Sequence, residues 1–360
     1  MTLVPTLLPQ QRKNNVGTMQ ARDFETLMEA VRLPALLVDR SGGIIASNPA
    51  ARISFGEMPA GTLFYLKFRM PEVRQAIEAA FKSQSPANCD YSVRVPTQRW
   101  FRLEVTPIKG PDMPDACFLL FQDISETRKI DQMRADFVAN ASHELRTPLA
   151  SLLGFIETLR GPARNDATAR EKFLSIMQEQ ANRMSRLIDD LLSLSRLEMR
   201  PFAQLTDQVD ITALVREMLD SLSPLAREAG VKIEQELPNR PIIISGIKDE
   251  LQQAIENLVE NACKYGKSGG RVIVRLGADT VSGDMVFSVR DFGPGIEQAH
   301  IPRLTERFYR ADSGNNPSLK GTGLGLAIVK HIVSRHNGQL GIQSTPGEGA
   351  TFTIRLPNTE

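Results

Sequence analysis

Two long stretches of helical periodicity lie in the middle of the chain, and they constrain its fold more than any other feature. In each stretch apolar residues recur at steps of three and four, which places them on one face of a helix. Gly161 and Pro162 end the first stretch near Arg160, and Asp166 or Thr168 can cap the second. The first stripe is Ile130, Met133, Phe137, Ala141, Leu145, Leu149, Leu152, Ile156 and Leu159, and the second is Phe173, Ile176, Gln180, Met184, Leu187, Leu191, Leu194 and Leu197.

The short connection between the two stretches predicts an antiparallel helical hairpin. A lone hairpin cannot bury both of its apolar stripes well. Pairing with a second copy would form a four-helix bundle, so the sequence predicts a homodimer. The stripes alone indicate only a coiled coil or a bundle, and they carry no chemistry of their own.

His143 lies on the first helical stretch, two residues from both Ala141 and Leu145. Two residues are about 200° of helical rotation, so the imidazole is expected to point away from the apolar stripe into solvent. Neutral imidazole is a competent nucleophile, and the neighbouring Glu144 can act as its general base. Pro148 is expected to bend the helix just beyond the nucleophile. A single histidine on a helix is more often a plain surface residue, so this reading needs support from elsewhere.

Length and composition bound the class of protein. A chain of 360 residues suggests two or three domains, and a formal net charge of +1 gives no general attraction to nucleic acid or anionic lipid. The three cysteines, Cys89, Cys117 and Cys263, are scattered, which argues against a disulfide framework and favours a reducing compartment. The chain shows neither a secretory signal nor an apolar run near the roughly 18 residues that span a bilayer. A cytoplasmic protein is expected, and membrane association through another segment or partner is left open.

The N-terminal third has the pattern of a small mixed domain. Residues 1–20 are polar, contain two prolines and predict a flexible tail. Residues 21–124 then predict short helices and an antiparallel sheet, and this order resembles a PAS sensor domain. A small spacer domain without a ligand is the alternative, and nothing in the stretch marks a haem or flavin site. The expected helices are 24–31 and 71–82, and the expected strands are 35–39, 44–48, 90–95, 100–107 and 116–122.

The C-terminal region, residues 201–360, predicts a separate α/β domain. Strands are expected at 208–211, 231–237, 241–245 and 285–290, with helices at 212–229 and before Arg335. On a further helix Asn257 and Asn261 are four residues apart and share one face, which suits a hydrated magnesium ion on a nucleotide. Lys264 can reach a phosphate from the same helix. Taken alone, these side chains would be ordinary surface amides.

Two glycine-rich segments favour the nucleotide interpretation. Asp291 ends a predicted strand and is followed by Gly293 and Gly295, so its carboxylate can accept the amino group of adenine where the glycines leave room. The segment from Gly321 to Gly325 precedes a helix, and its backbone N–H groups can close on phosphate.

These motifs together resemble the sensor histidine kinases. His143-Glu144-Leu145-Arg146-Thr147-Pro148-Leu149 is similar to the phosphoacceptor H-box of that family, and the later segments resemble the N, G1, F and G2 boxes of the GHKL ATP-binding fold, over about residues 126 to 360. The resemblance implies a multidomain α+β protein, with a PAS-like α/β sensor (21–124), a dimerising two-helix phosphotransfer domain (125–200) and a GHKL (Bergerat) α/β sandwich (201–360).

The resemblance also implies roles for single residues. His143 would accept the γ-phosphoryl of ATP with help from Glu144, and Thr147 would orient water when a response regulator is dephosphorylated. Asn257 and Asn261 would hold Mg²⁺ on ATP. Phosphate contacts are expected from Lys264, Arg307 and Arg310, flanking of the nucleotide from Tyr265 and Tyr309, adenine recognition from Asp291, and close backbone approach from Gly293, Gly295, Gly321, Gly323, Leu324 and Gly325.

The family implies a response regulator receiver domain as the partner. Thr147 to Ser151, residues 154–164 and residues 303–310 look like phosphate-regulon sensor kinases, which indicates phosphate-starvation signalling. Residues 311–320 predict a mobile lid, and Arg200-Pro201 predicts a hinge. Leu304-Thr305 departs from the Ile-Phe pair of many members, which puts the packing of the lid in question.

Two other functions remain open at this point. A non-kinase GHKL ATPase, such as a chaperone or a mismatch-repair clamp, would turn over ATP without an exposed histidine on a dimer helix. A scaffold or phosphatase that has lost kinase activity is the second, and the intact Glu144, Asn261 and Asp291 argue against it.

Overall fold

A computed structural model describes residues 21–93, 98–110, 113–199, 205, 207–311 and 321–358. The chain divides into two compact units, with the boundary between Ala135 and Asp136. The predicted tail (1–20), the Arg200-Pro201 hinge and all but the first residue of the predicted lid lie outside the described residues.

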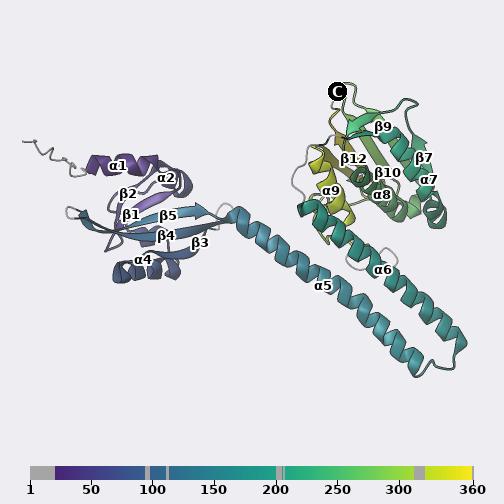
Figure 1. The fold of residues 1–360 in the computed structure, drawn as a ribbon, viewed down its shortest axis with the longest axis horizontal. Coiled ribbons are helices and arrows are strands. Elements are labelled where there is room, and N and C mark those ends of the chain that lie inside the picture. The colour runs from purple at the N-terminus through teal and green to yellow at the C-terminus, as the bar shows by residue number, and fades with distance from the viewer. Residues whose placement is uncertain are drawn as a thin grey trace, which may run out of the picture. The chain divides into compact units, whose positions relative to one another are not determined.

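The first unit is built on an antiparallel five-stranded sheet with the order β2-β1-β5-β4-β3 (Figure 1). All five strands predicted from the sequence are present, and the predicted helices at 24–31 and 71–82 are confirmed as α1 and α4. Strands β4 and β5 are longer than predicted because they continue as a hairpin as far as the Gly110–Met113 pair. The elements are α1 (Ala21–Ala30), β1 (Ala35–Asp39), β2 (Ile44–Ser47), α2 (Pro49–Phe55), α3 (Phe64–Lys67), α4 (Pro71–Ser83), β3 (Ala87–Val93), β4 (Arg99–Gly110) and β5 (Met113–Asp123).

Aromatic rings fill the interior of this unit. Phe64 and Phe68 stack with ring centroids 4.4 Å apart, and Phe121 lies 5.2 Å from Phe68. Phe55 closes the group against Phe101 at 5.0 Å. Such contacts add to the burial of apolar area, and aliphatic side chains such as Leu36, Ile77 and Leu103 complete this core.

Asn48 ties three segments of the first unit together from a buried position. Its Oδ1 accepts hydrogen bonds from the backbone N–H groups of Ala35 and Ala51, both at 2.9 Å. Its Nδ2 donates to the carbonyls of Val31 and Leu33, both at 2.8 Å. One side chain therefore caps α2, starts β1 and holds the end of α1.

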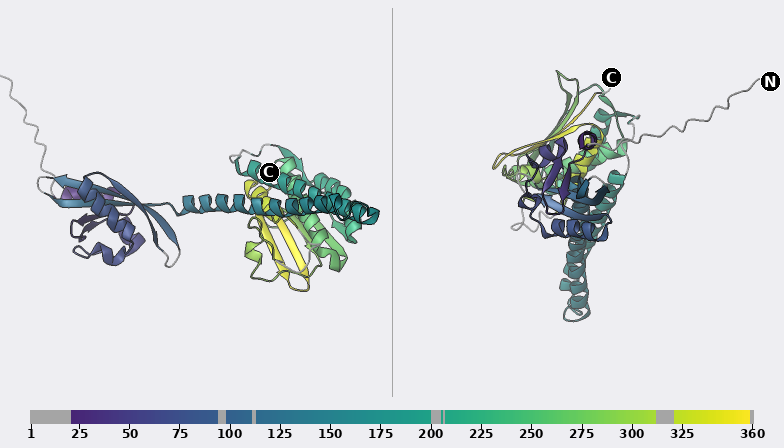
Figure 2. Two further views of the ribbon diagram at one scale, coloured as in Figure 1. Left: turned by 90° about the horizontal axis from the view of Figure 1, so that it is seen from below. Right: turned by 90° about the vertical axis from the view of Figure 1, so that its left-hand side faces the viewer.

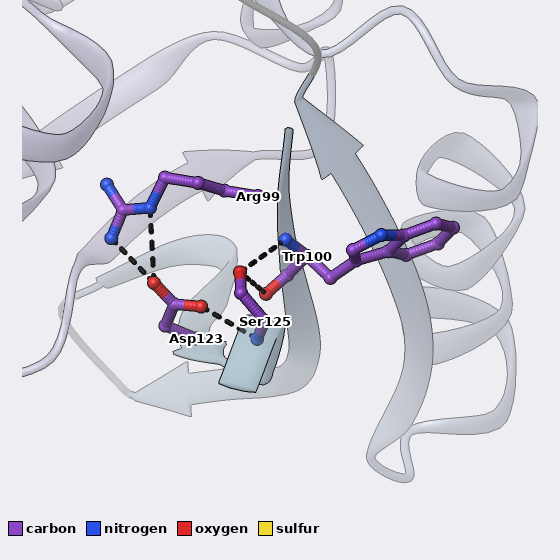
Figure 3. Close-up of polar contacts among 4 residues, drawn as sticks. All are labelled: Arg99, Trp100, Asp123 and Ser125. Carbon is purple, nitrogen blue, oxygen red and sulfur yellow. Dashed lines mark hydrogen bonds and ion pairs between the residues drawn. The ribbon is translucent and has the colours of Figure 1, made fainter. Parts of the chain in front are cut away.

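The junction between β5 and the following helix is fastened to β4 (Figure 3). Asp123 accepts from the backbone N–H of Ser125 at 2.9 Å and pairs with Arg99, whose NH2 lies 2.6 Å from Oδ2. The Ser125 hydroxyl accepts the N–H of Trp100 at 2.8 Å and donates to its carbonyl at 3.4 Å. Arg128, one turn into the helix, pairs with Asp90 and lies over the Trp100 ring at 5.3 Å. The start of the helix is therefore bound rigidly to the sheet.

The predicted helical hairpin is confirmed as α5 (Ser125–Arg160) and α6 (Ala167–Met199). Asp166 is the cap of α6, because its carboxylate accepts the N–H of Ala169 at 2.9 Å. Helix α5 continues through Pro148 without interruption, although that proline cannot donate to the carbonyl of Glu144.

Parts of the apolar surface of the hairpin are uncovered in the single chain. Leu149 is 47% exposed and Leu153 is 54% exposed on α5, and Ile188 on α6 is 43% exposed. A run of exposed large apolar side chains on paired helices is typical of an unfilled helix–helix interface.

The C-terminal lobe is an α/β sandwich. Its sheet has the order β11-β12-β10-β9-β7, in which only the β7–β9 pair is parallel, and β6 and β8 form a separate two-stranded pair. Figure 2 shows this sheet beside the helices α7, α8 and α9. The buried apolar residues of the helices and of the sheet belong to one core cluster. The elements are β6 (Gln208–Asp210), α7 (Ile211–Ala229), β7 (Lys232–Glu236), β8 (Ile243–Ser245), α8 (Lys248–Tyr265), β9 (Arg271–Ala278), β10 (Met285–Asp291), α9 (Gly325–Arg335), β11 (Gln339–Thr345) and β12 (Gly349–Leu356).

None of the helices in the described part of the chain combines the length and the apolar character that a bilayer crossing requires.

The hydrogen bonds of Asn48 make a prediction about the first unit. Replacing Asn48 with Ala leaves two buried N–H groups and two carbonyls without their partner, so the free energy of unfolding should fall by about 3 kcal/mol. Urea denaturation measures this change. Asn88→Ala is the matched control, because Asn88 is exposed on β3 and its replacement should leave the midpoint unchanged. Equal midpoints for the two variants would contradict the role of Asn48.

Candidate active site

The predicted acceptor, His143, is exposed on α5, as its position relative to the apolar stripe predicts. Glu144 forms an ion pair with Arg183 of α6, with Oε2 and NH2 3.1 Å apart. The hydroxyl of Thr147 donates to the carbonyl of His143 at 3.3 Å. The imidazole is thus accessible, and its neighbouring carboxylate is held by a cation of the antiparallel helix.

The two amides of α8 lie beside the first residue of α9. Asn257 donates from Nδ2 to the carbonyl of Gln253 at 2.9 Å, and its Oδ1 faces the start of α9. A Cβ atom at Gly325 would lie 2.6 Å from that Oδ1 and 3.8 Å from Nδ2 of Asn261. Glycine therefore keeps open the space that both amides face, and side-chain carbonyl oxygens are ligands that Mg²⁺ accepts.

Lys264 lies one turn further along α8 and is surrounded by positive charge. Burial and the nearby charges of Arg310, Arg186 and Arg183 together lower the pKa of Lys264 to about 8, against the opposing effect of Glu260. A Cβ atom at Gly321 would lie 2.7 Å from its Nζ. Cations gathered around a half-buried lysine form a site for an anion such as a phosphate chain.

Asp291 is buried at the end of β10, where the sequence predicts it. Burial raises the pKa of this carboxyl, and the backbone N–H groups of Gly293 at 2.9 Å and Ala350 at 3.3 Å oppose that shift by donating to Oδ1. Both donors bind the same oxygen. The helix α8 ends beside it, since a Cβ atom at Gly266 would lie 3.0 Å from the Asp291 Cβ.

The predicted glycines allow close approach of backbone segments. A Cβ at Gly293 would lie 2.3 Å from the carbonyl oxygen of Tyr265. Gly295, with φ +73°, would place a Cβ 2.1 Å from the carbonyl oxygen of Thr345. These loops can only take glycine, because any side chain would collide with main chain.

The loop before α9 is joined to the predicted F-box, which is Glu306-Arg307-Phe308-Tyr309-Arg310. The N–H of Phe308 donates to the carbonyl of Gly323 at 2.9 Å, and both residues have positive φ. Leu324 is fully buried just before α9. The departure at Leu304-Thr305 is accommodated, because Leu304 is buried and Thr305 accepts a hydrogen bond from Lys330 at 3.2 Å.

The remaining predicted residues have partners that the sequence did not indicate. Arg307 pairs with Glu198 of α6 at 2.5 Å and lies over the Phe137 ring of α5 at 5.4 Å, so its guanidinium faces the hairpin. The hydroxyl of Tyr309 contacts Nδ1 of His300 at 2.5 Å. The roles of Arg307 and Tyr309 toward a nucleotide stay predictions.

Residues of α6 that sequence reasoning missed also reach this region. Arg183 and Arg186 contribute charge around Lys264, and Asp190 accepts a hydrogen bond from the hydroxyl of Thr322 at 2.8 Å. The only sequence signal is that both arginines directly flank the apolar stripe. Nothing in the sequence pairs them with positions far along the chain.

Two family models match this chain. The His Kinase A (phospho-acceptor) domain matches residues 133–200, and the Histidine kinase-, DNA gyrase B-, and HSP90-like ATPase matches residues 246–360. The matched segments contain His143 and the predicted nucleotide residues, respectively.

Curated relatives and a solved structure agree with these matches. The phosphate regulon sensor protein PhoR of Pseudomonas aeruginosa is 42% identical over 239 residues, which cover 66% of this chain and 53% of the relative. The sensor protein kinase WalK of Staphylococcus aureus is 32% identical over 356 residues, covering 96% of this chain and 58% of the relative. A crystal structure of the histidine kinase ThkA in complex with the response regulator protein TrrA shares the fold, with a TM-score of 0.51, 18% identity, and coverage of 93% of this chain and 98% of that chain.

The chain belongs to the two-component sensor histidine kinases. It spans little more than half the length of these two curated relatives.

The environment of Lys264 makes a prediction about stability. Because burial and neighbouring cations lower its pKa to about 8, the charged side chain costs folding energy below that pH. Lys264→Met should therefore raise the free energy of unfolding at pH 7 by about 1 kcal/mol, after allowance for solvent screening of a half-exposed group. The gain should shrink above pH 8 and vanish above the ordinary lysine value of 10.5, where the side chain is neutral in both states.

Urea denaturation between pH 6 and pH 10.5 measures the effect of Lys264→Met. Lys267→Met is the matched control, because Lys267 is exposed in the turn after α8. A gain that does not change with pH would refute the electrostatic explanation.

Proposed function

We propose that this protein is an ATP-dependent histidine kinase that phosphorylates itself on His143 and passes the phosphoryl group to an aspartate of a response regulator receiver domain. The observation that carries the proposal is that one chain contains two features. One is an exposed histidine, His143, beside the carboxylate of Glu144, and the other is the site formed by Asn257, Lys264 and Asp291. An ATPase without a protein acceptor has no need of that histidine.

The C-terminal lobe would hold ATP with magnesium. Oδ2 of Asp291 would accept the amino group of adenine, because the N–H groups of Gly293 and Ala350 both bind Oδ1. Asn257 and Asn261 would hold Mg²⁺, and the space at Gly325 that a Cβ would fill supports the fit. The ion would supply charge neutralisation on the phosphates. Lys264 and Arg310 would add the positive charge that draws the phosphate chain to the start of α9.

The residues of the hairpin would carry out the transfer. His143 attacks phosphorus through one ring nitrogen, the bond from phosphorus to the β–γ bridging oxygen breaks, and ADP leaves. Glu144, oriented by Arg183 at 3.1 Å, accepts the proton of the other ring nitrogen. Thr147, one turn beyond, would orient a water when the regulator is dephosphorylated.

Assembly and signalling follow from the same surfaces. A second copy would cover the exposed apolar side chains of α5 and α6 and form a four-helix bundle.

The N-terminal unit would act as a PAS-type sensor, with the Asp123–Arg99 and Ser125–Trp100 contacts passing its state into α5. The similarity to the phosphate regulon sensor PhoR supports phosphate starvation as the signalling context. The three cysteines are free thiols, which fits a cytoplasmic location for these domains.

Loss of the acceptor makes the first functional prediction. His143→Gln should abolish acid-labile, base-stable labelling of the full chain by γ-labelled ATP and Mg²⁺, because glutamine offers no nucleophilic nitrogen. Glu144→Gln should slow labelling about 100-fold, the effect of losing a general base. Glu157→Gln, an exposed glutamate on the same helix, is the control and should label normally. Label that persists in His143→Gln would refute His143 as the acceptor, whereas ATP turnover without any labelled protein would favour a non-kinase ATPase.

The buried carboxyl of Asp291 makes the second functional prediction. In Asp291→Asn the amide oxygen can still accept from Gly293 and Ala350, but the amide nitrogen cannot accept from adenine, so ATP should bind about 100-fold more weakly. Burial raises the pKa of Asp291 above 3.8, so the ionised form costs stability at neutral pH and the variant should unfold no more easily than wild type.

Calorimetric ATP titration and urea denaturation test both halves of the Asp291 prediction. Any stability gain of Asp291→Asn should vanish as the pH falls below 3.8, where the wild-type carboxyl is protonated in both states. Asp220→Asn, exposed on α7, is the matched control. Unchanged ATP affinity in Asp291→Asn would remove the adenine assignment.

A further inference from the structure

His336 is a buried residue that the proposed chemistry does not use. It directly follows α9 and is only 2% exposed. Its Nδ1 lies 2.8 Å from the carbonyl oxygen of Ile332, and its Nε2 accepts the backbone N–H of Ile247 at 3.0 Å. A carbonyl can only accept and an N–H can only donate, so the imidazole is neutral, with its hydrogen on Nδ1.

The N–H that His336 accepts belongs to the residue before α8. Ile247 has no side-chain oxygen to cap the helix. In a capping box the acidic residue at the third helical position accepts this N–H, and here that residue is Glu250. Glu250 instead pairs with Arg335, with Oε2 and Nε 3.5 Å apart and both side chains buried. Two consecutive residues at the end of α9 therefore hold the first turn of α8.

The same two helices meet again at the candidate nucleotide site. Gly325 begins α9 and lies against Asn257 of α8, so the helices run antiparallel. Ile247 and Asn257 are ten residues apart, about 15 Å along a helix. A shift of α8 along α9 at the His336 end would move the amides relative to Gly325 by the same distance, because a helix is axially stiff.

We propose that His336 is a positioning residue, which together with Arg335 sets the axial register of α8 on α9 and so holds Asn257 and Asn261 at the start of α9 for Mg-ATP. The proposal deepens the proposed function and rests on it. The space around the imidazole supports it, because a Cβ atom at Gly246 would lie 3.0 Å from Cδ2 of His336 and 2.7 Å from Leu251. Glycine at 246 is what allows the ring to reach Ile247.

The hydrogen bond from Ile247 requires the neutral ring. Burial lowers the pKa of His336 below 6.5, while Glu250 on α8 opposes that shift and Arg335 on α9 reinforces it. A lowered pKa means that the contact is complete above pH 6.5 and is lost as the pH falls through the folded-state value. In the protonated ring Nε2 would carry a hydrogen that faces the N–H of Ile247.

Titration of the full-length protein with Mg-ATP tests the positioning role. His336→Leu removes the acceptor, and the dissociation constant should rise about five- to tenfold, as for the loss of one hydrogen bond. His336→Gln keeps an acceptor and should recover part of the affinity, and Gly246→Ala should weaken binding as His336→Leu does. Val274→Ala, a core truncation in β9, is the stability control and should lower the melting temperature without changing the affinity.

Two further readouts separate positioning from simple stabilisation. The amide of Ile247 should exchange with solvent faster in His336→Leu. The affinity ratio between wild type and His336→Leu should fall toward one as the pH drops through the folded-state pKa of His336, which lies below 6.5. Comparing ratios cancels the titration of ATP itself.

The outcomes separate this inference from the proposed function. If wild type binds no Mg-ATP, both fall. If wild type binds and His336→Leu or Gly246→Ala binds equally well, or Val274→Ala loses as much affinity at the same melting temperature, only the positioning role falls.

Discussion

The close approach of α8 and α9 is the contact on which the C-terminal lobe depends. It is possible because Gly325 has no side chain, so the start of α9 can lie against Asn257. The residues proposed to contact a nucleotide lie on α8, at the end of β10, and between β10 and the first residue of α9. Gly293 lies against the carbonyl of Tyr265 at the end of α8. Gly323, just before α9, accepts a hydrogen bond from the N–H of Phe308. A small backbone separation at one point thus decides the geometry of a site contributed by four separate segments.

The hairpin illustrates the opposite situation, in which a structural element is incomplete by itself. Its helices bury part of their stripes against each other and against the C-terminal lobe, while Leu149 and Leu153 stay exposed. A second copy would remove this apolar area from water, at roughly 25 cal/mol per Å². The nucleophilic imidazole is kept off that surface by helical rotation, so dimerisation and accessibility of His143 do not compete.

Electrostatics connects the hairpin with the lobe. Arg183 holds Glu144 and adds to the positive charge around Lys264, and Thr322 donates to Asp190 of α6. Positive charge that is costly to the free protein becomes favourable when a polyanion is bound. In the proposed mechanism Arg183 would therefore both orient the base Glu144 and prepare the neighbourhood of the phosphates.

Much of the fold followed from local patterns. The hairpin, the first unit's strands, α7, β10 and α9 were predictable, because each rests on a periodicity or a cap within a few residues. Strands β9, β11 and β12 were not predicted, although Ser282-Gly283 and Pro346-Gly347 are turn signals at the β9–β10 and β11–β12 hairpins. What no local pattern shows is the pairing between distant strands, such as that of Met285 in β10 with Leu356 in β12. The lengthening of β4 and β5 has the same origin, because it depends on pairing across the hairpin.

By itself the sequence determined the residue types and their order: a histidine beside a glutamate off an apolar stripe, two amides one turn apart, an aspartate at a strand end and glycines where backbone must pass close. Local periodicity carries that information because helical and strand geometry repeat every few residues. Only the tertiary structure decided which distant groups meet. Glu144 with Arg183, Asp291 with Ala350, and His336 with Ile247 are separated by 39, 59 and 89 residues, and their contacts arise from the packing of whole elements.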